Sequence, residues 1–409
     1  MLNLIWSGFF IVAFILAIVK SLHGDFSVWQ QISASLFDSA DSGFRISIGL
    51  TGVLCLWLGL LKIAEKSGLT EVLAKLLRPF FHAIMPDLKK DSPAFGSIVM
   101  NVAANILGLD NAATPMGLKA FAQMQKENPH PDRASNSQIM FMVLNSSSLT
   151  LLPITILMYR YQFGSANPAL VFIPILLATS VSTLAGFLAT AVYQKINIFK
   201  PIVLSYLLGG MFLIGGIGFC FFRLSPDSRI NTTMFISNAV LFGLAALFIV
   251  WGLLKKQNVY ENFIEGAKEG FSIAIQIIPY LVAMLVAIGV FRAAGGLEAI
   301  CSVLEKIMDY FAINHDFVKA LPTAFMKPLS GSGARAMMLD TFKTYGVDSF
   351  AGFASSIVQG STETTFYVLA VYFGSVKISK TGAALPLALF ADFCGVIAAI
   401  ALAYFFYQE

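Results

Sequence analysis

Residues 97–121 read SIVMNVAANILGLDNAATPMGLKAF, a stretch that is apolar on both sides and polar in the middle. Its length would suffice for a membrane-spanning helix, which needs about 20 apolar residues. Asp110, Asn111 and Pro115 interrupt it, however, and a helix break at membrane depth frees backbone groups that lipid cannot satisfy. Such a segment must be buried in protein or line a water-filled cavity. We therefore predict a re-entrant helical hairpin here.

A second stretch of the same kind covers residues 318–342, VKALPTAFMKPLSGSGARAMMLDTF. Pro322 and Pro328 break its helix, and the Ser-Gly-Ser-Gly sequence at 330–333 allows unusual backbone conformations. It predicts a second re-entrant hairpin.

The composition places both hairpins in a membrane protein. Of 409 residues, 57% are hydrophobic and only 12% charged, and the mean hydropathy is +0.76. Soluble domains are about 45–50% apolar and about 25% charged. Because this chain is more apolar and less charged than that, its composition excludes a soluble enzyme. The 27 Lys and Arg residues, against 23 Asp and Glu, are scattered over short loops, so we expect no nucleic-acid binding. The four cysteines and four histidines form no metal-ligand spacing, and we expect neither a metal site, nor another cofactor, nor an enzyme.

Apolar runs of spanning length predict about nine further membrane crossings. The first, from Leu4 to Val19, lacks the basic start of a signal peptide and is read as an uncleaved span. The nine runs lie near 3–20, 45–64, 137–160, 168–193, 201–222, 232–254, 271–292, 350–375 and 383–407.

The two halves of the chain resemble each other. FDSADSGFRISIGL at 37–50 aligns with IEGAKEGFSIAIQI at 264–277, and VLNSSSLTL at 143–151 aligns with IVQGSTETT at 357–365. The order of features is kept while the offset shrinks, which indicates an internal duplication. We predict a first span at 1–25, a first repeat at 26–194, a linking pair of spans at 195–256 and a second repeat at 257–409.

Loop charges predict that the repeats are inverted. The connection after the opening helix of the first repeat carries six cations, Lys62, Lys66, Lys75, Arg78, Lys89 and Lys90. Its counterpart in the second repeat carries only Arg292 and Lys306. By the positive-inside rule the first is cytoplasmic and the second external, which puts the N-terminus inside and the C-terminus outside. Arg160, Arg223 and Arg229 conflict modestly with this orientation. Inverted repeats with broken helices are typical of secondary transporters.

The hairpin tips are the first candidate sites. Helix starts and unusual turns at a tip offer N–H groups, hydroxyls and carboxylates to a substrate or ion. The candidates in the first tip are Asn105, Asp110, Asn111 and Thr114, and those in the second are Ser330, Gly331, Ser332 and Gly333. The alternative is that these residues only cap buried turns. Lys327 and Arg335 beside the second tip would then snorkel to the surface or pair with Asp340.

Two polar stretches inside spans predict helix breaks, one in each repeat. Their candidate substrate-binding residues are Asn145, Ser146 and Ser147 in the first, and Ser361, Thr362, Glu363 and Thr364 in the second. Carboxylates at membrane depth are costly unless paired, protonated or functional. Asp110, Glu363 and Asp392 are therefore candidates for ion coupling, with Na⁺ or H⁺ as the ion. The alternatives are a structural partner for Glu363 and helix-helix bonding for Asp392.

These motifs carry a family resemblance. GLTGVLCLWLGLLKIAEKSGL, NVAANILGLDNAATPMGLKA and LNSSSLTLLPITI resemble spore maturation protein A, whereas PLSGSGARAMMLDTFKTYG and GSTETTFYVLAVYFGSV resemble spore maturation protein B. The chain thus resembles a fusion of the two, within the gate or nucleoside-recognition group of membrane proteins. The resemblance implies a transporter-like fold in the bacterial cytoplasmic membrane, and it does not specify a substrate.

The sequence therefore predicts an all-α polytopic membrane protein that moves a small polar organic solute, such as an amino acid, short peptide or nucleoside-like compound, by alternating access. Its expected partners are that solute and the lipid bilayer, and assembly into a homo-oligomer is left open. Two alternatives remain: a translocator of lipid or lipid-linked envelope precursors, and a membrane scaffold that transports nothing.

Overall fold

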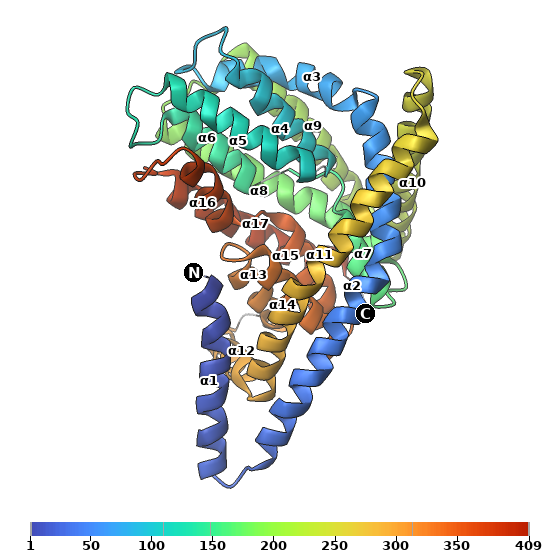
Figure 1. Ribbon diagram of the computed structural model, residues 1–409, viewed down its shortest axis with the longest axis vertical. Helices are drawn as coiled ribbons and strands as arrows, with labels where there is room; N and C mark the ends of the chain where they lie inside the picture. Colours follow the sequence, from blue (N-terminus) through green and yellow to red (C-terminus); the bar gives the residue numbers. More distant parts are fainter. Residues whose placement is uncertain (1, 109, 148, 313, 408–409) are drawn as a thin grey trace.

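The computed structural model describes residues 2–108, 110–147, 149–312 and 314–407, without the side chains of 2, 110–112 and 226. Throughout these residues the chain forms helices and no strands, as predicted (Figure 1). The core is apolar and divided mainly between two clusters. One lies around α2 (Ser27–Lys66), α11 (Val259–Ala293) and α14 (Gly331–Tyr345), and the other lies around the first hairpin.

Seven helices among the described residues are long and apolar enough to cross a membrane. They are α1 (Leu2–Leu22), α2 (Ser27–Lys66), α8 (Phe172–Tyr193), α9 (Pro201–Arg223), α10 (Pro226–Leu254), α11 (Val259–Ala293) and α17 (Ala384–Phe406). They correspond to seven of the nine predicted runs, and the other two are the runs in which helix breaks were predicted. The runs at 137–160 and 350–375 are each divided into two short helices, because polar residues and Pro153 interrupt the first and a polar stretch interrupts the second.

Each half contains the same succession of α-helices, with a 3₁₀ segment at a different place in each. In the first half α2 is followed by α3 (Leu69–Ile84), the hairpin α4 (Ala94–Leu107) and α5 (Asp110–Glu127), the broken helix α6 (Asn136–Ser147) and α7 (Ile154–Gln162), η1 (Pro168–Val171) and α8. In the second half α11 is followed by α12 (Gly296–Tyr310), η2 (Asp316–Ala320), the hairpin α13 (Leu321–Met326) and α14 (Gly331–Tyr345), the broken helix α15 (Phe350–Ser361) and α16 (Thr365–Ser375), and α17. Both predicted hairpins and both predicted breaks are therefore present.

The long helices α2 and α11 run antiparallel and pack closely along their length (Figure 1). Gly43 of α2 lies against Val282, and Gly270 of α11 lies against Leu54 and Cys55. Small residues let helix backbones approach closely, which favours association where lipid supplies no hydrophobic driving force. Gly43 and Gly270 are 227 positions apart, which is the offset at which residues 37–50 align with residues 264–277. The two contacts are therefore equivalent under the predicted inverted repeat. The repeat itself stays a prediction.

A second antiparallel pair joins the halves at their last helices, α8 and α17. Gly186 of α8 lies against Ala391, and Gly395 of α17 lies against Ser182. The Ser182 hydroxyl also donates to the Ala391 carbonyl at 2.9 Å. The two halves thus pack on each other through two helix pairs, α2–α11 and α8–α17, and each pair has glycines at its contacts.

The outer helices present apolar surface. In α9 only Val203 and Phe221 are buried, and Phe212 of α9 and Phe242 of α10 are exposed. Large apolar patches on a monomer mark an interaction surface, and a lipid bilayer fits spanning helices of this kind. The chain is therefore a multi-pass membrane protein.

The substitution Gly270→Ala should destabilise the α2–α11 pair. An added Cβ would lie 2.7 Å from the Leu54 carbonyl oxygen, a backbone atom that cannot swing away. Overpacking of this kind costs about 1–3 kcal/mol. Gly218→Ala in α9 is the control, since its Cβ would meet no atom within 4 Å. In a thermal-unfolding measurement in detergent, only Gly270→Ala should lower the midpoint, and equal midpoints for both variants would contradict the packing.

Candidate functional site

The two helix breaks meet at the centre of the molecule. The first lies between Ser147, which ends α6, and Ile154, which begins α7, and the second lies between Ser361 and Thr365. The Glu363 backbone N–H donates to the Ser146 carbonyl at 2.7 Å. A backbone donor freed by one break is thus satisfied by a carbonyl freed by the other.

Each hairpin tip is docked on the break of its own half. The Leu151 N–H donates to the Ile106 carbonyl at 2.9 Å, and the Phe366 N–H donates to the Pro328 carbonyl at 3.0 Å. Gly108, which ends the first helix of the first hairpin, has a φ of +75° and lies against Leu152. That backbone conformation is open to glycine at little cost. Both tips and both breaks therefore converge on one region.

A cavity of about 150 Å³ opens where they converge, and we call it the polar cavity. It takes residues from both hairpins and both breaks, including three charged side chains, Lys327, Arg335 and Glu363. The uncharged polar residues that line it are Asn105, Thr150, Thr155, Gln359, Thr362 and Thr364. Lys327 is buried and has an interaction of its own within the protein.

A second cavity of about 220 Å³, the tyrosine cavity, shares Asn105 and Glu363 with the first. Tyr367 and Tyr372 of α16 line it together with Asn145 of α6. The Asn105 amide donates to Asn145 Oδ1 at 2.9 Å, and the Tyr372 hydroxyl donates to the same oxygen at 3.4 Å. Hydrogen bonds across three helices from both halves hold this wall together.

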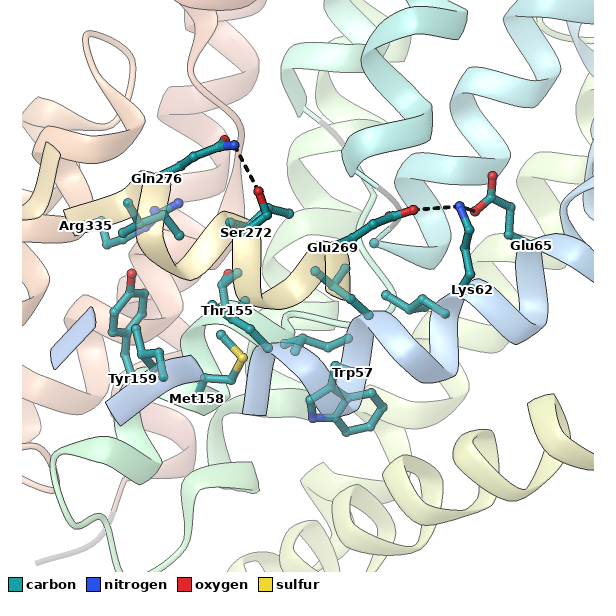
Figure 2. Close-up of a pocket in the computed structure, with 18 residues that line it drawn as sticks. Trp57, Lys62, Glu65, Thr155, Met158, Tyr159, Glu269, Ser272, Gln276 and Arg335 are labelled. Atoms are coloured by element: carbon teal, nitrogen blue, oxygen red, sulfur yellow. Dashed lines mark hydrogen bonds and ion pairs between the residues drawn. The ribbon is translucent and has the colours of Figure 1, made fainter. Parts of the chain in front are cut away.

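A third and larger cavity of about 650 Å³, the apolar cavity, lies beside α2, α7 and α11 (Figure 2). Most of its lining is apolar, and at one end Lys62 of α2 pairs with Glu269 of α11 at 2.9 Å and with Glu65 at 3.2 Å. Toward its other end Arg335 lies above Tyr159, with 5.8 Å from the guanidinium carbon to the ring centroid (Figure 2). Arg335 and Thr155 line both this cavity and the polar cavity, so the two adjoin.

Glu363 is the one charged residue common to the polar and tyrosine cavities. It is exposed, while Thr362 and Thr364 on either side are buried. Its carboxylate forms no hydrogen bond or ion pair with any residue that the structure describes. A carboxylate that faces two cavities without a protein partner is available to a ligand.

Asp392 of α17 lies behind the second break and lines none of the three cavities. It is 3% exposed. Its Oδ2 accepts a hydrogen bond of 2.6 Å from the Thr365 hydroxyl, whereas Oδ1 has no partner within the described part of the chain. The Thr362 side chain and the Lys327 ammonium also interact with this carboxylate. A buried carboxylate with a free oxygen at membrane depth is a candidate to take up a proton or a cation.

The predicted site residues fall into three groups. Those that line the polar or tyrosine cavity are Asn105, Thr114, Asn145, Gly331, Thr362, Glu363 and Thr364. Those that lie outside these cavities are Ser146, Ser147, Ser330, Ser332, Gly333, Ser361 and Asp392. The side chains of Asp110 and Asn111 lie outside the described residues.

The serines of the second group satisfy the protein itself. The hydroxyls of Ser146 and Ser147 donate to the Val143 carbonyl, and that of Ser361 donates to the Val358 carbonyl. Ser330 caps α14 by accepting from the Gly333 N–H at 3.0 Å. The capping alternative therefore describes Ser330, and the other three serines satisfy carbonyls of their own helices.

Sequence reasoning missed Arg335, Lys327 and Tyr372 as lining residues. The first two carry charges at membrane depth, which is the same signal that identifies Glu363. A pairing with Asp340 was expected as an alternative, but Asp340 accepts from Arg292 Nε at 2.7 Å. Tyr372 gave no signal, because one tyrosine in an apolar helix is unremarkable in a sequence.

Comparison with known proteins gives one family and two relatives. The model of the family described as "Gate", nucleoside recognition, matches residues 47–161 and 274–379, more than half of the chain. Spore maturation protein A of Bacillus subtilis is 38% identical over 188 residues, which are 46% of this chain and 93% of that protein. Spore maturation protein B of the same organism is 47% identical over 165 residues, 40% of this chain and 91% of that protein. The two cover different parts of the chain, as a fusion would. No solved structure matches.

Cysteine labelling tests whether water reaches Glu363. In a background without Cys55, Cys220, Cys301 and Cys394, the variant Glu363→Cys should react with a charged, membrane-impermeant thiol reagent, because the position is exposed to the cavities. Ser361→Cys, at a fully buried position on the same break, is the control and should react at least about tenfold more slowly. Equal rates would show that the cavities are closed to water.

Proposed function

The chain belongs to the gate family of nucleoside-recognition domains, and from this premise and the geometry of its centre we propose that it is a secondary-active transporter of a small polar organic solute. Binding sites of secondary transporters lie near the bilayer midplane and are typically formed by discontinuous helices.

One observation carries the proposal. Two hairpin tips and two helix breaks converge on adjoining cavities, and an exposed carboxylate, that of Glu363, stands between them. Non-helical backbone and charge are costly at membrane depth and are tolerated where they line a functional cavity. A scaffold that transports nothing would have no need of a polar cavity of about 150 Å³ lined by Lys327, Arg335 and Glu363.

Alternating access requires parts that move against a fixed frame. The α2–α11 and α8–α17 pairs, with glycines pressed against the opposite helix, are suited to be the frame. Lys62, which bridges Glu65 and Glu269 at one end of the apolar cavity, is suited to close that end in one state.

Asp392 is our candidate for the coupling ion, Na⁺ or H⁺. Its Thr365 partner opens α16 directly after the break, so a change of charge on Asp392 would act on the helix that carries Tyr367 and Tyr372. We place the protein in the bacterial cytoplasmic membrane with its N-terminus inside and its C-terminus outside, and assign it no enzymatic activity.

Transport by reconstituted protein tests the proposal. Vesicles containing the protein are given an extract of bacterial metabolites, and the solutes that enter are identified by mass spectrometry. We expect at least one polar solute to enter, and Glu363→Gln, which removes the charge that faces both cavities, to abolish its entry. Glu261→Gln, at an exposed position of α11, is the control and should transport normally. The absence of any transported solute from folded, inserted protein would overturn the proposal.

The Asp392→Asn variant tests coupling in the same vesicles. An amide keeps the shape of the carboxyl and can still accept from Thr365, but it neither takes up a proton nor neutralises Na⁺. Solute exchange should therefore persist, while accumulation driven by a Na⁺ or H⁺ gradient should be lost. Unchanged gradient-driven accumulation would remove Asp392 from the coupling mechanism.

A second candidate function, translocation of a lipid or lipid-linked precursor, is favoured by one observation. The apolar cavity is several times larger than the polar cavity that it adjoins at Arg335, an arrangement suited to an acyl chain with a polar headgroup. Native mass spectrometry distinguishes the two candidates, since a translocator should retain a lipid that Trp57→Ala releases.

A further inference from the structure

We propose that the transported solute carries a primary ammonium group and, a few bonds away, a carboxylate, as an amino acid or short peptide does. The inference rests on the proposed function and adds the chemical class of the solute. It follows from the hydrogen-bonding groups that the polar cavity offers.

One acceptor on the second break is open to the polar cavity, the carboxylate of Glu363. It forms no hydrogen bond or ion pair with a described residue. Gln359 and Thr362 also line the cavity, but Gln359 Oε1 and Thr362 Oγ1 are themselves buried, and the Thr362 side chain interacts with Asp392. A charge without a partner at membrane depth is costly, and a bound ligand of opposite charge can recover that cost.

An ammonium group matches this arrangement. It has three N–H donors and no acceptor, and it carries the charge that the Glu363 carboxylate would compensate. A hydroxylated, uncharged solute such as a nucleoside could donate to the carboxylate, but it would leave the carboxylate charge uncompensated. The Glu363 carboxylate therefore favours a primary amine over a nucleoside.

Another part of the lining, contributed by the second hairpin, suits an anion. Arg335 lines it, and Gly331 opens α14 there. The N-terminus of a helix presents unpaired N–H groups and a partial positive charge, and here Ser330 satisfies only the Gly333 N–H. A guanidinium binds a carboxylate through two parallel hydrogen bonds, which adds geometric specificity.

The charges also limit the solute. Arg335 and Glu363 line one cavity of about 150 Å³ and form no ion pair with each other. The third charged residue of the lining, Lys327, interacts electrostatically with Asp392. A zwitterion can satisfy both at once, whereas a purely anionic or purely cationic solute would leave one of them uncompensated. The tyrosine cavity, reached past Glu363, gives a side chain or second residue room beyond the backbone of the solute.

Binding to the purified full-length protein tests the inference. The probes are alanine and alanyl-alanine, each compared with its N-acetyl, C-terminal amide and N-trimethyl derivatives. The first derivative removes the ammonium charge, the second removes the carboxylate, and the third keeps the charge but removes every N–H donor. We expect calorimetry to detect binding of at least one unmodified probe and about 10- to 100-fold weaker binding of each of its derivatives.

Two variants assign the two halves of the site. Glu363→Gln should weaken binding of the parent probe and reduce its preference over the N-acetyl derivative, and Arg335→Gln should do the same for the amide. Glu261→Gln and Arg45→Gln, both exposed, are the charge controls.

The inference is overturned if no unmodified probe binds to folded protein, or if the derivatives bind as tightly as the parents. Phosphoethanolamine is included as a headgroup probe, and its binding in place of both parents would point instead to a lipid. If the vesicles transport a nucleoside in a Glu363-dependent manner, the transporter proposal stands and this inference fails. If the vesicles transport nothing, both fail.

Discussion

The backbone groups freed by two helix breaks have to find partners inside the protein, and the structure at its centre follows from that requirement. The Glu363 N–H bonds to the Ser146 carbonyl, and each hairpin tip supplies a carbonyl to the break of its own half. Lipid could satisfy none of these groups. The breaks are therefore held together, and the space between them is left polar.

The same centre concentrates charge that a membrane protein otherwise avoids. Lys327 and Arg335 come from one hairpin and Glu363 from one break, all in the second half, whereas the first half contributes amides and hydroxyls such as Asn105 and Asn145. The two halves thus share a framework and differ in chemistry. The charged side chains of the polar and tyrosine cavities belong to the second half, and the first half supplies a neutral, hydrogen-bonded wall.

Much of this could be predicted from sequence, because interruptions of apolar stretches are visible as polar residues, Pro and Gly. The hairpins, both breaks and the cavity-lining roles of Asn105, Asn145 and Glu363 were predicted in this way. The division of the runs at 137–160 and 350–375 into two short helices each follows from the same polar residues.

The direction in which side chains point is a feature that the sequence did not predict. Ser146, Ser147 and Ser361 lie in the predicted breaks, yet their hydroxyls bond to carbonyls three or four residues back in their own helices. A serine on a helix always has this local option, and the sequence does not show when it is taken. Tyr372 reaches Asn101 and Asn145 only because α16 of the second half lies against α5 of the first.

The glycine contacts between the halves have a consequence for cells that make the halves as separate polypeptides. Gly43 and Val282, or Gly186 and Ala391, would then lie on different chains. A half made in excess would expose to lipid helix faces that are shaped for a missing partner, together with the unpaired carbonyl of its break. Membrane proteases and chaperones can recognise such a face. Separate halves would therefore have to be made in equal amounts to escape them, whereas a single polypeptide always contains one copy of each half.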